Sequence, residues 1–261
     1  MKKMLTLMIL AGVLGAPALH AKEWKEVVIA MDATYPPFES VAPDGALVGF
    51  EVDLANALCV EMKVKCRLVN VGWDALIPGL VAKKHDALMT SMNVTEERKR
   101  AIDFSNTYYL MQNRFVAKKG SNTVISKDGL KGKTIAVQTG SAQDNFVTEQ
   151  FGDVATIKRY TGAGEPYLEL LNGRADLHFG SVVQIGDGFL SKGGNDKKFE
   201  FVGPSYTGKQ NKKLGEGVAV GVRKQDSELR ERFNAGLAAL KKNGGFKKIV
   251  DKYFPEDADD K

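Results

Sequence analysis

Arg98 follows a run of short polar side chains that could help it bind an anion. Thr90, Ser91 and Asn93 precede it and end a predicted strand. A guanidinium offers paired N–H donors that match the two oxygens of a carboxylate. An isolated arginine would be better explained as an exposed residue on a helix. The hydroxyl and amide groups beside this one favour a carboxylate-binding site.

An acid and an aromatic residue stand where an earlier strand ends. Val27–Met31 is an apolar run of strand length, and Asp32 and Tyr35 follow it before Pro36-Pro37 forces an extended or turned path. Ligands of open α/β sheets bind at the carboxyl ends of strands, so this placement predicts a small-molecule site. A buried carboxylate is costly unless paired, so Asp32 favours a cationic ligand group, with a capping or turn acid as the alternative.

The segments that carry these residues alternate between strands and helices. Strands are predicted over residues 27–31, 65–71, 86–89, 133–137, 154–157, 175–179 and 217–222. Helices are predicted over residues 53–62, 166–172 and 227–243, after the caps Asp74 and Thr95, and after a turn over residues 138–143. This alternation predicts an α/β protein with sheets built from βα units.

The N-terminus has the three parts of a signal peptide. Lys2 and Lys3 are positive, residues 4–14 are apolar, and small residues follow up to Ala21. We predict a cleavable signal peptide over residues 1–21, with cleavage after Ala18 as the alternative, and export to the periplasm. A transmembrane anchor would need an apolar run of about 20 residues, which is longer than this one.

The remaining chain carries a small net positive charge. Removing residues 1–21 leaves 240 of the 261 residues, and losing Lys2 and Lys3 lowers the formal net charge from +5 to +3. This length suits two modest lobes or one large domain. The basic residues are spread along the sequence without a dense run, so no nucleic-acid partner is expected.

The two cysteines, Cys59 and Cys66, suit an oxidising compartment. They fall at the end of a predicted helix and the start of the next strand, where a disulfide would fix the connecting turn. A metal or redox role is the alternative, but no CxxC motif and no nearby histidine support it. We therefore predict a structural disulfide, no metal site and no cofactor.

The segment Gly49-Phe50-Glu51-Val52-Asp53-Leu54, with Leu58 after it, resembles the signature of the periplasmic polar amino-acid binding proteins of ABC importers (solute-binding protein family 3). The lysine/arginine/ornithine and histidine binders are the most similar in pattern. The resemblance covers nearly the whole mature chain. It implies a two-lobe periplasmic binding protein fold of type II, with residues 22–110 and 212–261 in one lobe and 113–206 in the other. The hinge crossings would lie near 110–112 and 207–211.

The same resemblance implies roles for the candidate residues. Arg98 would bind the ligand's α-carboxylate, helped by the preceding turn, and Asp32 would receive the distal cation. Tyr35 and Trp73 would form aromatic walls that pack an aliphatic stem or stack on a guanidinium, although Trp73 also fits a core position. Ser141 and Gln143 would close over the carboxylate from the second lobe, at a helix N-terminus that favours an anion.

Three positions depart from the family pattern of basic amino-acid binders. Ala142 replaces a threonine, Gln138 replaces an apolar residue, and Ser181 replaces the aspartate that holds the α-ammonium. Losing a charge-assisted hydrogen bond costs about 1.5–3 kcal/mol. The replacement predicts a ligand with a missing or altered α-amine, such as an ω-amino acid, a guanidino acid or an N-substituted opine. Arginine, lysine or ornithine remains an alternative if a water or another acid, such as Asp187, replaces the aspartate.

The function predicted from these features is ligand capture for an ABC permease by a monomeric periplasmic protein, without catalysis. An enzyme of the same fold, such as a prephenate or arogenate dehydratase, and a sensor domain are the alternatives. No nucleophile–base pair or phosphate-binding loop occurs in the motifs above. His178, between two apolar residues, is typical of a packed strand position and is not included in the site.

Overall fold

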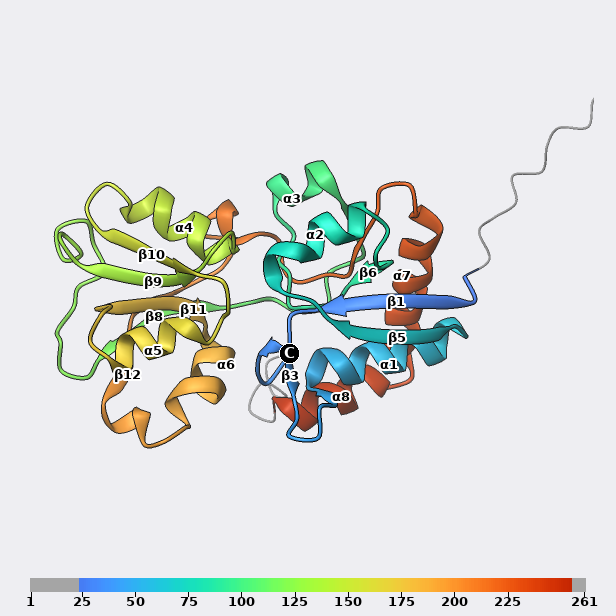
Figure 1. The fold of residues 1–261 in the computed structure, drawn as a ribbon, viewed down its shortest axis with the longest axis horizontal. Coiled ribbons are helices and arrows are strands. Elements are labelled where there is room, and N and C mark those ends of the chain that lie inside the picture. Colours follow the sequence, from blue (N-terminus) through green and yellow to red (C-terminus); the bar gives the residue numbers. More distant parts are fainter. Residues whose placement is uncertain (1–23, 255–261) are drawn as a thin grey trace, which may run out of the picture.

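The computed structural model describes residues 24–254, which form two α/β units joined side by side (Figure 1). Each unit has a five-stranded sheet, so the expected α/β fold class is observed. The predicted signal peptide, residues 1–21, lies outside the described residues. Within residues 24–254, no helix is long and apolar enough to cross a membrane.

The first unit surrounds the sheet that contains the N-terminal strand. Its elements are β1 (Glu26–Met31), β5 (Lys65–Asn70), β6 (Ala87–Leu88), β7 (Asp103–Phe104), β13 (Gly221–Val222), α1 (Phe50–Met62), α2 (Trp73–Val81), α3 (Glu96–Ala101), α7 (Ser227–Lys242) and α8 (Gly245–Tyr253). The strand order is β5–β1–β6–β13–β7, with β1 parallel to β5 and β6. Alternate residues of β1 serve opposite faces: Val27 and Ile29 pack with α1 and α7, and Ala30 packs with α2.

The second unit is built from one continuous stretch of chain. Its elements are β8 (Asn113–Lys118), β9 (Thr134–Gln138), β10 (Thr156–Tyr160), β11 (Leu177–Ser181), β12 (Phe199–Tyr206), α4 (Ala142–Phe151), α5 (Glu165–Leu171), α6 (Val182–Ile185), a π-helical turn (Gly186–Leu190) and a 3-10 turn (Asn195–Lys197). The order is β10–β9–β11–β8–β12. Helices α4 and α5 lie on opposite faces of this sheet (Figure 1). Ile135 and Val137 pack with Phe146 of α4, whereas Ala136 packs with Leu170 of α5.

Two segments connect the units. The chain leaves β7 at Phe104 and enters β8 at Asn113, and it returns from Tyr206 through a 3-10 turn (Lys212–Leu214) to β13. The two segments are hydrogen-bonded to each other, because the Val218 amide donates to the Tyr109 carbonyl at 2.8 Å. Both passages between the sheets therefore lie side by side.

A three-stranded hairpin sheet covers the N-terminus of α1. It consists of β2 (Thr34–Tyr35), β3 (Glu39–Val41) and β4 (Leu47–Val48). Gly49, which begins α1, has φ +132°, and a Cβ there would lie 2.3 Å from the Phe38 carbonyl oxygen. Only glycine fits this position, since it has no Cβ and tolerates positive φ. The close approach fixes the hairpin, and with it Tyr35 and Glu39, against α1.

The structure confirms the disulfide and corrects several local predictions. Cys59 and Cys66 are bonded, with their Cα atoms 6.1 Å apart. The cap of α2 is Gly72, because Asp74 lies within the first turn. The strand predicted over 217–222 is limited to β13, since Gly217 has φ +123°. The helix α8 and the hairpin sheet were not predicted.

Candidate functional site

A pocket lies between the two units, at the ends of β1, β6 and β9. Residues of the first unit and its connection line one wall: Asp32, Tyr35, Glu39, Trp73, Thr90, Ser91, Asn93, Arg98 and Met111. Residues around the start of α4 line the other: Gln138, Ser141, Ala142 and Gln143. The structure thus brings together all the predicted ligand-binding residues except Ser181.

Arg98 supplies a buried positive charge at this pocket. It is 8% exposed and lies in α3, whose cap Thr95 accepts a hydrogen bond from its amide. The guanidinium donates to the carbonyls of Asn93 at 2.8 Å and Gly140 at 3.2 Å, and it stacks over Trp73 at 5.2 Å. Burial lowers the pKa of Arg98 to about 10, so the group stays cationic at neutral pH.

No carboxylate forms an ion pair with Arg98 among residues 24–254; its hydrogen-bond acceptors are neutral carbonyl groups. A buried charge without a counter-ion is costly, and an anion entering the pocket would remove much of that cost. The guanidinium keeps N–H donors beyond the two used by the carbonyls, so it can bind a carboxylate.

Two buried acids, Asp32 and Glu39, also line the pocket. Asp32 is 4% exposed, and Glu39 is fully buried. The Thr90 hydroxyl accepts from the Asp32 amide at 2.9 Å and donates to Glu39 Oε1 at 3.1 Å. Glu39 Oε2 is buried without a hydrogen-bond partner. Burial raises the pKa of both carboxyl groups, so a cationic group would stabilise their charged forms.

Glu39 and Met111 were missed by the sequence analysis. Glu39 lies on the unpredicted hairpin, and no periodic pattern marks it as buried. Met111 lies in the connection between the units, where its sulfur is approached by Gln143 Nε2 at 3.2 Å, Asn93 Nδ2 at 3.5 Å and the Tyr35 hydroxyl at 3.9 Å. An apolar residue in a predicted connection gave no sign of a site.

A third buried acid, Glu51 of α1, supports the turn that follows β6. Its Oε1 accepts from both the amide and the hydroxyl of Ser91 at 3.1 Å, and the Tyr108 hydroxyl donates to both of its oxygens at 2.9 and 2.7 Å. Ser91 has φ +49°, a left-handed conformation that is uncommon for residues other than glycine. Glu51 therefore stabilises the backbone that presents Ser91 to the pocket.

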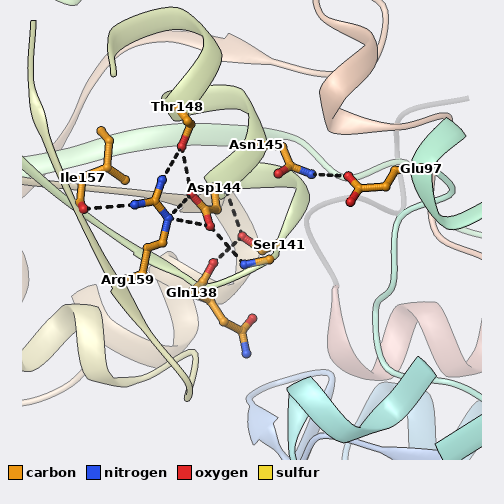
Figure 2. Close-up of polar contacts among 9 residues, drawn as sticks. Glu97, Gln138, Ser141, Asp144, Asn145, Thr148, Ile157 and Arg159 are labelled. Atoms are coloured by element: carbon orange, nitrogen blue, oxygen red, sulfur yellow. Dashed lines mark hydrogen bonds and ion pairs between the residues drawn. The ribbon is translucent and has the colours of Figure 1, made fainter. Parts of the chain in front are cut away.

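The wall of the second unit is held by a polar network at the start of α4 (Figure 2). The Ser141 hydroxyl accepts from the Asp144 amide at 3.0 Å and donates to the Gln138 carbonyl at 2.8 Å. Asp144 accepts from the Gly140 amide at 3.0 Å and forms an ion pair with Arg159 at 2.9 Å. Because Asp144 already occupies the helix N-terminus, the turn is fixed before any ligand binds.

Direct hydrogen bonds join the two units around the pocket. One of these contacts, from Asn145 of α4 to Glu97 of α3, is visible in Figure 2. The bonds run from Arg98 to the Gly140 carbonyl, from Gln138 Nε2 to Asp32 Oδ2 and from Asn145 Nδ2 to Glu97 Oε2, each at 3.2 Å. The units are therefore in contact on both sides of the pocket, in a closed arrangement.

Ser181 does not line this pocket. It is fully buried at the end of β11, where its hydroxyl caps α6 by accepting from the Gln184 amide at 3.4 Å. It also hydrogen-bonds Tyr35, whose pKa is raised by burial and lowered in part by this bond. Tyr35 thus stands between Ser181 and the pocket, and Asp187 is likewise not among the lining residues.

A closed cleft between two α/β units, lined by a buried cation and two buried acids, is typical of a protein that binds a small polar solute. The chain matches the model of the bacterial extracellular solute-binding proteins, family 3, over residues 27–256, and it belongs to that family. No cluster of three or more potential metal ligands occurs within residues 24–254.

Individual relatives agree with this assignment. The chain is 44% identical to the L-arginine-binding protein of Pseudomonas aeruginosa over 259 residues, which cover 98% of each chain. It is 38% identical to the lysine/arginine/ornithine-binding periplasmic protein of Escherichia coli over 97% of this chain and 96% of that one. The structure of an ancestral arginine-binding protein bound to arginine superposes with a TM-score of 0.80, at 32% identity, over 88% of this chain and 98% of that chain. The two-lobe binding-protein fold expected from the sequence is thereby confirmed.

Proposed function

We propose that this protein captures a cationic amino acid, or a related compound, in the periplasm and delivers it to an ABC permease. The candidate ligands are arginine, ornithine or lysine, an octopine-like derivative, and an ω-amino or guanidino acid that lacks the α-amine. The observation that carries the proposal is that one pocket is lined both by Arg98, which has no ion-pair partner among residues 24–254, and by two buried acids, Asp32 and Glu39. A ligand with a carboxylate and a separate cationic group is complementary to both kinds of charge.

In this proposal each wall has a defined task. Arg98 binds the carboxylate together with the Ser91 and Ser141 turns. Asp32 and Glu39 receive the distal cation, while Tyr35 and Trp73 pack the aliphatic part between them. The names of the relatives, which include arginine and lysine/arginine/ornithine binders, support a basic ligand.

Capture occurs by hinge closure between two lobes. We assign residues 22–110 and 212–261 to the first lobe and 113–206 to the second, with hinges near 110–112 and 207–211. The ligand stabilises the closed state because only there does it contact both lobes. Small-angle scattering should show a smaller radius of gyration with ligand, and an unchanged radius would contradict closure.

Calorimetry on the mature protein, refolded to remove co-purified ligand, tests the proposal. Arginine should bind at least 100-fold more tightly than citrulline, a nearly isosteric amino acid without the charge, because an unpaired buried acid costs about 3 kcal/mol or more. Asp32→Asn should reduce this preference. The matched control is Asp44→Asn, on the exposed hairpin loop, which should not change it. Equal affinity for arginine and citrulline would overturn the proposal.

The proposal also states that the ligand is released unchanged, by a monomer without a cofactor. Homologues named as solute-binding proteins support a protein that is not an enzyme. Chromatography of arginine and of prephenate after incubation with the protein tests this point directly. Conversion of prephenate would favour an enzyme of the same fold.

A further inference from the structure

A second, smaller cavity adjoins the pocket, between Tyr35 and the second unit. The two spaces adjoin each other, because four residues line both: Tyr35, Gln138, Ser141 and Gln143. The rest of this inner cavity is lined by Ala163, His178, Phe179, Gly180 and Gln184. Among residues 24–254, Asp32 and Glu39 are the only acids that line either space.

The inner cavity presents unsatisfied polar atoms. Gln184 is 1% exposed and His178 is 4% exposed, and both Gln184 Nε2 and His178 Nε2 are buried without a hydrogen-bond partner. Buried polar groups in folded proteins are almost always hydrogen-bonded, so two unpaired groups lining one cavity indicate a missing partner.

The chemistry of the two atoms is different. His178 Nδ1 lies 2.8 Å from the Ala136 carbonyl, which only accepts, so Nδ1 carries the proton. Burial lowers the pKa of His178 to about 4, which leaves Nε2 as a hydrogen-bond acceptor at neutral pH. The Gln184 amide nitrogen is a donor. The cavity therefore offers one acceptor and one donor to a neutral group.

Gly180 helps to create this space. A Cβ at Gly180 would lie 2.6 Å from His178 Nε2 and 3.4 Å from Ile185 Cδ1. Any larger residue would press against the imidazole and fill the cavity next to its free nitrogen. The glycine thus keeps His178 Nε2 accessible from the cavity.

We propose that the inner cavity holds a short, neutral branch of the ligand, one that ends in a hydroxyl or primary amide and is attached to its α-nitrogen. This inference rests on the proposed function. The proposed function assigns the carboxylate to Arg98 and the distal cation to Asp32 and Glu39, so no acid of either space is left for the α-nitrogen. That nitrogen is the point from which a branch can leave without disturbing either charged contact. A hydroxyl there would donate to His178 Nε2 and accept from Gln184 Nε2.

Calorimetry with four arginine derivatives tests the inference: unsubstituted arginine, and arginine carrying a 2-hydroxyethyl, a propyl or a carboxymethyl group on the α-nitrogen. The hydroxyethyl compound should bind at least about tenfold more tightly than the propyl compound, which has the same size but cannot form hydrogen bonds. Equal affinities of these two would overturn the inference. Tightest binding of the carboxymethyl compound would also overturn it and make the cavity an anion site.

Two cavity variants test whether the preference for the hydroxyethyl compound arises in the inner cavity. Gln184→Leu and Gly180→Ala should each lower the ratio of hydroxyethyl-arginine to propyl-arginine affinity towards one, whereas the control Gln225→Leu, at an exposed glutamine, should leave the ratio as it is in the wild type. An unchanged ratio in both cavity variants would contradict the inference. The same titrations distinguish failure of this inference from failure of the proposed function. If no arginine compound binds, the proposed function fails. If arginine binds but the hydroxyethyl compound gains nothing over the propyl compound, only the branch fails and the cavity holds water.

Discussion

Replacing Arg98 by lysine separates the geometry of the anion site from its charge. The replacement keeps the type of charge: the lowered pKa of Arg98 is about 10, so Arg98 is cationic at neutral pH, and an ordinary lysine has a pKa of about 10.4. The guanidinium, however, binds two carbonyls from opposite walls and still has N–H donors for a ligand. A lysine ammonium has three donors on one atom and cannot form the planar fork.

The expected loss of ligand affinity follows from the number of hydrogen bonds that lysine cannot form. Lysine can replace the charge but not both the Gly140 contact and a bidentate carboxylate, so at least one hydrogen bond to a charged group is lost. Such a bond contributes about 1.5–3 kcal/mol, which corresponds to a loss of affinity of about 10-fold to 150-fold. The stacking on Trp73 would weaken as well.

Calorimetric titration of arginine into wild type and Arg98→Lys measures this loss. Arg100→Lys is the matched control, because Arg100 lies on the same helix and is exposed; its dissociation constant should stay within twofold of wild type. A dissociation constant for Arg98→Lys that also stays within twofold would refute the assignment of Arg98 as a bidentate carboxylate ligand.

Three further predictions concern groups around the site. Burial raises the pKa of Glu51 from an ordinary 4.5 to about 7, so the folded state binds the proton more tightly than the unfolded state. The free energy of unfolding of the wild type should therefore fall as the pH rises from 4.5 to 7. Urea unfolding of Glu51→Gln should show a smaller fall over this range, and the same fall in both proteins would contradict the prediction. The double variant Cys59→Ser/Cys66→Ser lacks the disulfide, and its free energy of unfolding in urea titrations should be about 2–3 kcal/mol lower than that of the wild type. An unchanged free energy of unfolding would contradict the stabilisation expected from loop closure. Asp144→Asn loses the ion pair with Arg159 and weakens the hydrogen bond to the Gly140 amide. Calorimetry should show arginine binding weakened about tenfold. An unchanged affinity would show that the turn at Gly140 keeps its structure without this charge.

The sequence predicted the parts of the fold that local patterns determine. Alternating strands and helices were visible because each strand is an apolar run and helices such as α3 begin at a capping residue, Thr95. The hairpin sheet was not visible, because its strands are two or three residues long. Helix α8 was overlooked although its apolar residues Phe246, Ile249, Val250 and Tyr253 have helical spacing and pack against the core; none of them is fully buried, and the helix is only nine residues long.

The site was predictable where a residue follows a strand and unpredictable where tertiary packing decides. Thr90, Ser91 and Asn93 follow a strand, as the general rule for α/β proteins requires. Glu39 reaches the pocket only because the hairpin folds back onto α1. Ser181 was expected to face the ligand, but Tyr35 lies in front of it, and no local pattern could reveal that order. Its role in ligand recognition stays a prediction.

The position of β13 has a consequence for how the chain acquires its structure during synthesis. This strand, Gly221–Val222, lies between β6 and β7, so the first sheet is missing an inner strand until residue 222 has been made. The second sheet needs only residues 113–206 and can form earlier. The N-terminal unit is therefore completed last, by long-range pairing that is intrinsically slow. During synthesis the first sheet therefore stays incomplete after the second sheet has all of its strands.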